Sequence, residues 1–173
     1  MIKQEIQTAE EQVGFDAMSY FKGLSEKNKL TKSLGFKAVS CSGPLSLEGV
    51  IGSMKHARNF IAIDDTNDGV VRESGGGYFK CVTYTVWILA KYKALDMNDR
   101  QEKLNLCRKI YKQFLSRILK DKYNWSMDFS YLLTGSIDTR EMSSWFLDGV
   151  TGVEFHLDID QPIELVYDAS EWE

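Results

Sequence analysis

Cysteine is scarce in this chain of 173 residues, and the three that occur are widely separated. Cys41, Cys81 and Cys107 form no Cys-x-x-Cys pair, which argues against a structural zinc site. Their number is odd, and Cys81 and Cys107 stand within apolar patterns. We therefore expect three reduced thiols that serve as small core residues, as is typical of an intracellular protein.

Long apolar runs are also missing. No stretch reaches the about 18 consecutive apolar residues that indicate a membrane-spanning helix, and the opening MIKQEIQTAEEQ lacks the apolar run of a secretory signal. A basic excess is missing too, because the net charge is -4 and the isoelectric point about 5.3, which argues against a dedicated nucleic-acid-binding domain. We expect a soluble cytoplasmic protein with no membrane partner.

What is present suits one ordinary globular domain, since 43% of the residues are hydrophobic and 27% are charged. Thr8 followed by Glu11 has capping-box spacing and predicts a first helix that ends near Lys27. The residues expected along its buried side are Val13, Met18, Phe21 and Leu24.

Short strands are predicted over residues 36–42 and 59–64, the first ended by Gly43-Pro44. The segment 45–57 between them favours neither helix nor strand. DTNDG, residues 65–69, predicts a turn. The stretch VVRESGGG, residues 70–77, is interpreted as a mobile glycine-rich loop or hairpin turn.

A long strand follows the glycines and presents two faces, because successive side chains of a strand point to opposite sides. One face is apolar and predicts core: Val82, Tyr84, Val86, Ile88 and Ala90. The other is mixed: Cys81, Thr83, Thr85, Trp87 and Leu89. A helix of the same chain or a neighbouring subunit is expected to cover part of this mixed face.

The clearest helix is predicted to start near Asp99 and Glu102, which again have capping-box spacing, and to end near Asp121. Its apolar positions recur every three or four residues: Leu104, Cys107, Tyr111, Phe114, Leu115, Ile118 and Leu119. Its outer face is basic: Arg100, Lys103, Arg108, Lys109, Lys112, Arg117 and Lys120.

The last third predicts two strands. Residues 128–142 favour a strand with a bulge at Gly135. Residues 150–160, VTGVEFHLDID, alternate clearly, with Pro162 expected to interrupt them and IELVY to extend the edge. The inward set is Val153, Phe155, Leu157 and Ile159, and the outward set is Glu154, His156, Asp158 and Asp160.

This order of elements predicts an α+β fold: a largely antiparallel sheet with a long central strand, packed against a long amphipathic helix and an N-terminal helix. We expect a single domain over residues 1–173. Within it, residues 1–58 would form an N-terminal helical or extension region, and residues 59–168 the sheet-and-helix core.

Two stretches resemble ligand-binding motifs but lack residues or elements that those motifs require. Gly75, Gly76 and Gly77 precede a strand, whereas a phosphate-binding loop needs a helix behind it and a Lys-Ser or Lys-Thr pair. The run beginning at Asp64 partly matches a calcium loop, but its twelfth position is Gly75 where a bidentate Glu is needed. We expect no cofactor and no metal.

Two further features leave alternatives open. His156 stands beside Glu154 and Asp158 and could act as a general base. No nucleophile motif accompanies it, so the pattern favours an exposed histidine with no role in catalysis. Three tryptophans flank the last strands and fit core or rim packing better than a base- or sugar-stacking platform. They are Trp125, Trp145 and Trp172.

Charge is distributed unevenly along the chain. From residue 150 onward there are seven acidic residues and no Lys or Arg, whereas the helix predicted over 99–121 is basic on its outer face. Two solvated faces of opposite sign would explain this pattern. Complementary surfaces on neighbouring identical subunits would also explain it, and such head-to-tail contacts can close a ring whose lumen passes DNA.

The element order from NFIAIDDTNDG, residues 59–69, to GVTGVEFHLDIDQPIEL, residues 149–165, resembles the tail terminator or tail-completion proteins of long-tailed bacteriophages and related head–tail neck proteins. The helix from Asp99 to Lys120 would correspond to their crossing helix. The resemblance implies ring assembly, commonly as hexamers, at the end of a tail tube that the ring caps and joins to the head. It implies no catalysis.

On this interpretation the protein is a non-enzymatic subunit of a virion tail or neck, assembled in the host cytoplasm, with itself and other tail proteins as partners. The predicted interface residues are Arg72, Glu73, Gly75, Gly76, Gly77, Thr83, Thr85, Trp87, Arg108, Lys112, Glu154, His156 and Asp158. An acidic monomeric protein-binding module of the immunity or inhibitor type is the alternative, and an enzyme that uses His156 is a second one.

Overall fold

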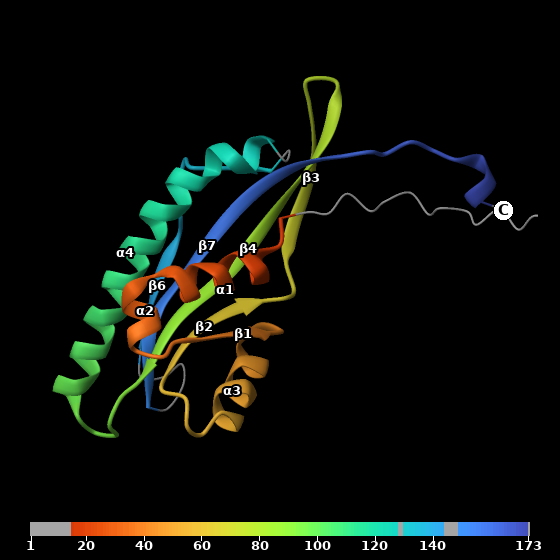
Figure 1. Cartoon of the computed structure of the whole chain (residues 1–173). Coiled ribbons are helices and arrows are strands. Elements are labelled where there is room, and N and C mark those ends of the chain that lie inside the picture. The colour runs from red at the N-terminus through yellow and green to blue at the C-terminus, as the bar shows by residue number, and fades with distance from the viewer. Residues whose placement is uncertain (1–14, 128–129, 144–148, 173) are drawn as a thin grey trace, which may run out of the picture.

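The computed structural model describes residues 15–127, 130–143 and 149–172 (Figure 1). The helices are α1 Ala17–Lys27, α2 Lys29–Ser33, α3 Gly43–Ser53 and α4 Met97–Met127, with a short 3-10 helix, η1, at Ala169–Glu171. The strands are β1 Lys37–Cys41, β2 Asn59–Asp64, β3 Asp68–Ser74, β4 Gly77–Lys91, β5 Tyr131–Leu132, β6 Thr139–Met142 and β7 Val150–Ile163.

The described strands form one sheet in the order β1-β2-β4-β7-β5, with β3 also paired to β4 and β6 to β7. The pair β4–β7 is the axis of the sheet and runs antiparallel from Tyr78 opposite Ile163 to Lys91 opposite Val150. Of the described pairs, only β1–β2 is parallel. The predicted α+β class, with its long central strand and long helix, is confirmed.

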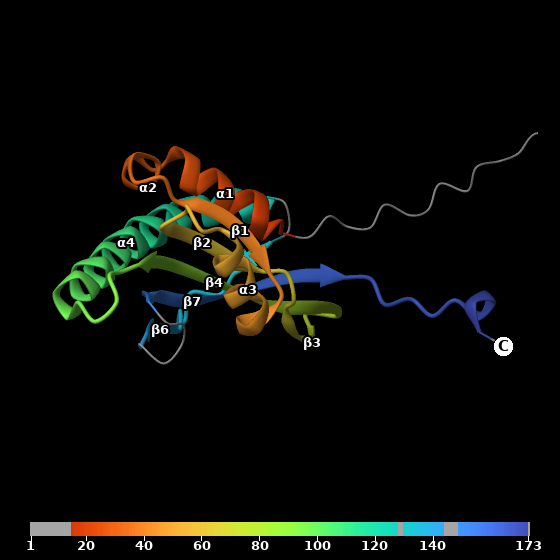
Figure 2. The ribbon, with the colours of Figure 1, turned by 90° about the horizontal axis from the view of Figure 1, so that it is seen from below.

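The first face of the sheet is covered by α1 and α4, which lie together along the same side in Figure 2. The apolar sets predicted for β4 and β7 are buried here, because their two-residue period matches the pleat. The aromatic rings of Phe15, Tyr20 and Trp125 join this core, so Trp125 is a packing residue.

The described residues cover the second face at one end only. There α3 contributes Leu47 and Ile51 to a smaller core that contains Trp87, Leu89 and Met142. The segment that the sequence left undecided is therefore helical. The N-terminus of α3 is stabilised by a residue far along the sequence. The Asp64 carboxylate accepts a hydrogen bond of 3.1 Å from the Gly43 backbone N–H.

The helix boundaries differ from the predicted ones. Helix α1 is capped by Asp16, whose side chain accepts from the Ser19 N–H, and it ends at Lys27 as predicted. The pair Thr8 and Glu11 lies outside the described residues. Helix α4 begins at Met97, with the Asp96 carboxylate accepting from the Asp99 N–H, and continues past Asp121 to Met127. It buries Ile110, whereas Leu119 is exposed.

The mobile loop predicted over residues 70–77 is wrong, whereas its alternative, a hairpin turn, is confirmed at the glycines. Residues 68–74 form β3, which pairs with β4 along its whole length, so the predicted turn at 65–69 stops at residue 67. Gly75 and Gly76 are the two turn residues of a β-hairpin, and both have positive φ, as a type I′ turn requires. Gly77 is the first residue of β4.

Two expectations for the last third are also wrong. Within the predicted strand 128–142, residues 130–142 do not form one bulged strand, because the short strands β5 and β6 pair separately with β7; residues 128–129 lie outside the described residues. Strand β7 continues through Pro162 to Ile163, and residues 164–167 add no strand. Among the described residues β5 reaches only as far as Asp160, so Pro162 lies beyond that pairing, at a position where a strand can hold proline.

Candidate assembly surface

The middle of the second sheet face, next to the part that α3 covers, is polar. We call it the open sheet face and define it by Thr83, Thr85, Glu154, His156 and Asp158, all of which are partly exposed. Register places them in facing pairs, with Thr83 opposite Asp158 and Thr85 opposite His156, while Glu154 lies opposite the buried Trp87. Six of the predicted interface residues therefore lie side by side.

Hydrogen bonds connect these side chains into a ladder. The Thr83 hydroxyl donates to Asp158 Oδ1 at 2.6 Å, and the Thr85 hydroxyl lies 3.0 Å from His156 Nδ1. His156 Nε2 lies 3.0 Å from Glu154 Oε1, and the Trp87 indole N–H donates to Glu154 Oε2 at 2.8 Å. Each side chain is held in place by its own neighbours, so the surface is rigid before any partner binds.

The surroundings of His156 favour a structural role. Both of its ring nitrogens contact side chains of the ladder, and none of the three cavities described below is lined by it. A general base needs an unoccupied nitrogen within reach of a substrate proton. The ladder uses Glu154 and Thr85 to orient the imidazole and leaves no such nitrogen.

The β3–β4 hairpin extends beyond the rest of the sheet (Figure 1). Arg72 forms an ion pair with the nearly buried Asp160 and lies over the Phe79 ring, so it braces the base of the hairpin. Glu73 is exposed, as are the apolar side chains of Val70 and Val71. The sequence pattern does not single out these two valines, because their stretch predicts a loop.

The basic helix face lies on the opposite side of the sheet from the ladder, because α4 packs on the first face. Arg108 forms two hydrogen bonds with Glu141, at 2.6 and 2.7 Å, and holds the pKa of that carboxyl below its usual value. Lys112 is exposed. The structure therefore separates these two predicted residues from the ladder.

The end of the described chain, residues 164–172, leaves the sheet and extends away from the body (Figures 1 and 2). We call it the C-terminal segment. It is exposed along its whole length, including Val166 at 74% and Tyr167 at 73%. The rings of Tyr167 and Trp172 stack with centroids 6.3 Å apart, so Trp172 is a surface residue. Trp145 lies outside the described residues.

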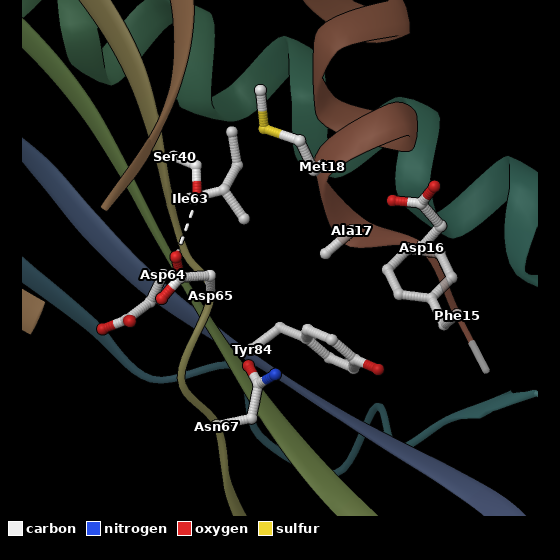
Figure 3. Close-up of a pocket in the computed structure, with 10 residues that line it drawn as sticks. All are labelled: Phe15, Asp16, Ala17, Met18, Ser40, Ile63, Asp64, Asp65, Asn67 and Tyr84. Atoms are coloured by element: carbon white, nitrogen blue, oxygen red, sulfur yellow. Dashed lines mark hydrogen bonds between the residues drawn. The ribbon is translucent and has the colours of Figure 1, made fainter. Parts of the chain in front are cut away.

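Figure 3 shows an acidic cavity of about 210 Å³ between the start of α1 and the end of β2. Its three carboxylates already accept hydrogen bonds: Asp16 from Ser19, Asp64 from Gly43 and Thr66, and Asp65 from Ser40 and Ser42. The stretch that partly matches a calcium loop thus begins with a turn stabilised by Asp64. Across the described residues, no group of three His, Cys, Asp or Glu side chains is placed to hold a metal ion.

Two other cavities lie beside α3. One, of about 340 Å³, is lined by residues that include Arg58, Lys91 and Val150. The other, of about 510 Å³, is a groove between the end of α2, the start of β1 and the segment after α3. We call it the basic groove. Its lining residues are Leu34, Gly35, Lys37, Ser53, Met54, Lys55, His56, Ala57 and Arg58.

Comparison with known proteins adds no relative: no protein-family model matches the sequence, and no curated protein matches it significantly. Over the part of the chain that the structure describes, no helix combines the length and apolarity needed to cross a membrane. Arguments about function therefore depend on the fold and on the surfaces described above.

Proposed function

We propose that the protein is a non-enzymatic structural subunit of a bacteriophage tail, which assembles with copies of itself into a ring, a hexamer in the simplest case, at the tail terminus or neck. The ring would cap the tail tube, join it to the head and pass DNA through its lumen. Assembly would take place in the host cytoplasm, with other tail proteins as further partners.

The observation that carries the proposal is the placement of opposite charges on opposite sides of one subunit. The exposed lysines of α4, Lys109, Lys112 and Lys120, lie on one side. The open sheet face, with Glu154 and Asp158, lies on the other. A contact between two different faces repeats from copy to copy and can close into a ring, whereas a self-complementary patch stops at a dimer.

The open sheet face keeps an acidic excess after its basic neighbours are counted. Register places Asp68 opposite Thr83 and Arg140 opposite Glu154, both exposed, while Arg72 neutralises Asp160. Three carboxylates, those of Asp68, Glu154 and Asp158, thus share this side with one arginine, Arg140. On α4, by contrast, Arg108 and Arg117 are neutralised by Glu141 and Asp121, and the exposed lysines supply the positive charge.

The two extensions support the tail-binding part of the proposal. The hairpin and the C-terminal segment both expose apolar side chains, among them Val70, Val71 and Val166, that the subunit's own core does not use. In the C-terminal segment three such residues are consecutive, Leu165, Val166 and Tyr167, and grouped apolar side chains at the surface are a common mark of protein–protein contact. Val70 and Val71 are neighbours in a strand and lie on opposite faces of the hairpin. The hairpin is our candidate for contact with the end of the tail tube.

The mass in solution tests the proposal directly. We expect light scattering to give a multiple of 19.8 kDa, and negative-stain images to show closed rings with a lumen. Reversing the charge of two lysines, by Lys109→Glu with Lys112→Glu, should shift the mass in solution toward that of the monomer. Lys29→Glu with Lys32→Glu, the same charge change on the exposed side of α2, is the matched control. A wild-type protein that stays monomeric at micromolar concentration would refute the proposed ring assembly.

A monomeric protein-binding module of the immunity or inhibitor type is the second candidate, and the rigid acidic ladder is the observation that favours it. Such a module would remain a monomer and bind a basic protein through Glu154 and Asp158. The same mass measurement separates the two candidates, because only the ring requires self-association.

A further inference from the structure

The basic groove has the chemistry of a peptide-binding site. Lys37, Lys55 and Arg58 supply three positive charges at its lining, and no acidic residue lines it. Leu34 and Met54 give it apolar surface. Its volume of about 510 Å³ lies within the roughly 300–1,000 Å³ range of ligand-binding clefts.

Positive charge also lies beside this groove, in a neighbouring cavity whose lining has Arg58 and Lys91 together with the carboxylate of Glu48. The Lys91 ammonium lies next to it and donates to the carbonyl oxygens of Ile51 and Met54 at 3.2 and 3.3 Å. Burial, and then the nearby Arg58 guanidinium, hold the pKa of Lys91 below its usual value. An occupant of this region should therefore carry negative charge beside an apolar group.

The C-terminal segment has that composition. It carries Glu164, Asp168 and Glu171 and no basic residue. Between the first two acidic residues lie three exposed apolar side chains, Leu165, Val166 and Tyr167. Its charge is opposite to that of the groove, and its apolar centre matches the groove's apolar lining.

The segment cannot reach the groove of its own subunit. Val150, at the start of β7, and Arg58 line the same cavity next to the groove, so the groove lies near that end of β7. The segment leaves from Ile163, thirteen residues further along the strand, which is about 43 Å at 3.3 Å per residue. The nine described residues of the segment span at most roughly 32 Å when fully extended. Figure 1 shows the same separation, with α2 at one end of the molecule and the C-terminus at the other.

We propose that the C-terminal segment of one copy docks into the basic groove of a second copy, with Tyr167 or its apolar neighbours in the cleft and the acidic residues beside Lys37, Lys55 and Arg58. This inference rests on the proposed ring, because a contact between opposite ends of two copies is the heterologous kind that rings use. It adds to that proposal a specific segment and its acceptor site.

A labelled peptide tests the docking separately from ring formation. The receptor is the full chain with Tyr167→Ser and Trp172→Ser, in which the protein's own segment is disabled at exposed positions. The probe is a fluorescein-labelled peptide of residues 164–172, followed by fluorescence anisotropy. We expect saturable binding that weakens at least about tenfold when the receptor also carries Lys55→Glu and Arg58→Glu. The matched control, Lys29→Glu with Lys32→Glu outside the groove, should bind as tightly as the receptor without them.

The outcomes separate the two proposals. The docking is overturned if the peptide does not bind. It is also overturned if the peptide binds equally well to the receptor that carries Lys55→Glu and Arg58→Glu. A wild-type ring whose mass is unchanged by Tyr167→Ser with Trp172→Ser also overturns it, while leaving the ring in place. Groove-dependent peptide binding by a wild-type protein that is monomeric shows that the groove binds peptides, but it overturns docking between copies as well as the ring. The strongest support would come from a double charge swap. A peptide with Glu164→Lys, Asp168→Lys and Glu171→Lys should bind again to the receptor that carries Lys55→Glu and Arg58→Glu. Charge complementarity alone would explain such restored binding.

Discussion

The indole N–H of Trp87 donates a hydrogen bond to Glu154 across the β4–β7 pair, at 2.8 Å, and this bond marks the boundary between the covered and the open parts of the second sheet face. Trp87 is only 2% exposed and belongs to the core under α3. Glu154 also contacts His156 at the edge of the open face. One carboxylate therefore connects the small core to the ladder.

Removing this acceptor should destabilise the fold. Glu154→Leu leaves the buried Trp87 N–H without a partner, which costs about 1–3 kcal/mol in the free energy of unfolding. Glu154→Gln keeps a carbonyl oxygen in nearly the same place and should cost much less. Urea unfolding followed by tryptophan fluorescence measures both. Equal losses for the two variants would contradict the role assigned to this hydrogen bond.

Gly152 should not tolerate any side chain. A Cβ there would clash with the backbone carbonyl oxygen of Ile88 and lie 2.9 Å from Leu89 Cδ2, so the β4–β7 pair would have to separate. We expect Gly152→Ala to cost at least about 3 kcal/mol, at the upper end of overpacking penalties, or to prevent folding. Gly49→Ala is the control, because it lies in α3 with open space around its Cβ and should be neutral or stabilising by up to about 1 kcal/mol. Thermal unfolding of both variants checks the contrast.

The hairpin turn depends on left-handed backbone at both of its central residues. Gly75 has φ 63° and Gly76 has φ 81°, and a Cβ at either position would meet nothing within 4 Å. The cost of Gly75→Ala is therefore conformational, about 1–2 kcal/mol. Gly75→Asn should cost less, because asparagine is common in type I′ turns. Unfolding free energies in urea give the comparison, and equal values for the two variants would argue against this turn.

Those parts of the fold that follow a periodic pattern could be predicted from the sequence. Strand β7 buries alternate residues on one side, so its period of two is visible in the chain. Strand β3 left no such signal, because its seven residues are all exposed and it is held by backbone pairing with β4. Its valines therefore looked like part of a loop.

Long-range contacts explain most of the remaining differences. The start of α3 is stabilised by Asp64, 21 residues further along the chain, and Arg72 pairs with Asp160 across 88 residues. No local pattern reports such pairs. The ladder was predictable in part, since Glu154, His156 and Asp158 alternate along one strand, but its partners on β4 required the register of the β4–β7 pair.

Stability should fall at alkaline pH. Burial raises the pKa of the Cys107 thiol to about 12, and burial with the nearby Asp64 and Asp65 raises that of Cys41 to about 12, from an ordinary value of 9.0. Above pH 9 the unfolded chain loses these protons while the folded chain keeps them, so the stability present below pH 9 is lost as the pH rises toward 12. Each thiol should contribute a slope of about 1.4 kcal/mol per pH unit.

The variant Cys107→Ala isolates one of these two slopes. Its free energy of unfolding at neutral pH falls because a buried side chain is shortened. Between pH 9 and 12, its free energy of unfolding should change less steeply with pH than that of the wild type, by the slope that one thiol contributes. Urea unfolding at a series of pH values measures the slope directly. A variant with the wild-type slope would show that Cys107 does not keep its proton in the fold.

Self-association should weaken as salt is added. In the proposed ring, Lys109 and Lys112 of one copy face Glu154 and Asp158 of the next, and these side chains are exposed or partly exposed in the subunit. The Debye length shrinks from about 10 Å at 0.1 M salt to about 3 Å at 1 M, so attraction between such faces is largely screened at the higher concentration. Sedimentation velocity across this range should show the mass falling toward 19.8 kDa, while circular dichroism stays constant. A mass that is constant or rises with salt would indicate an apolar contact and would remove the charge pairing from the proposal.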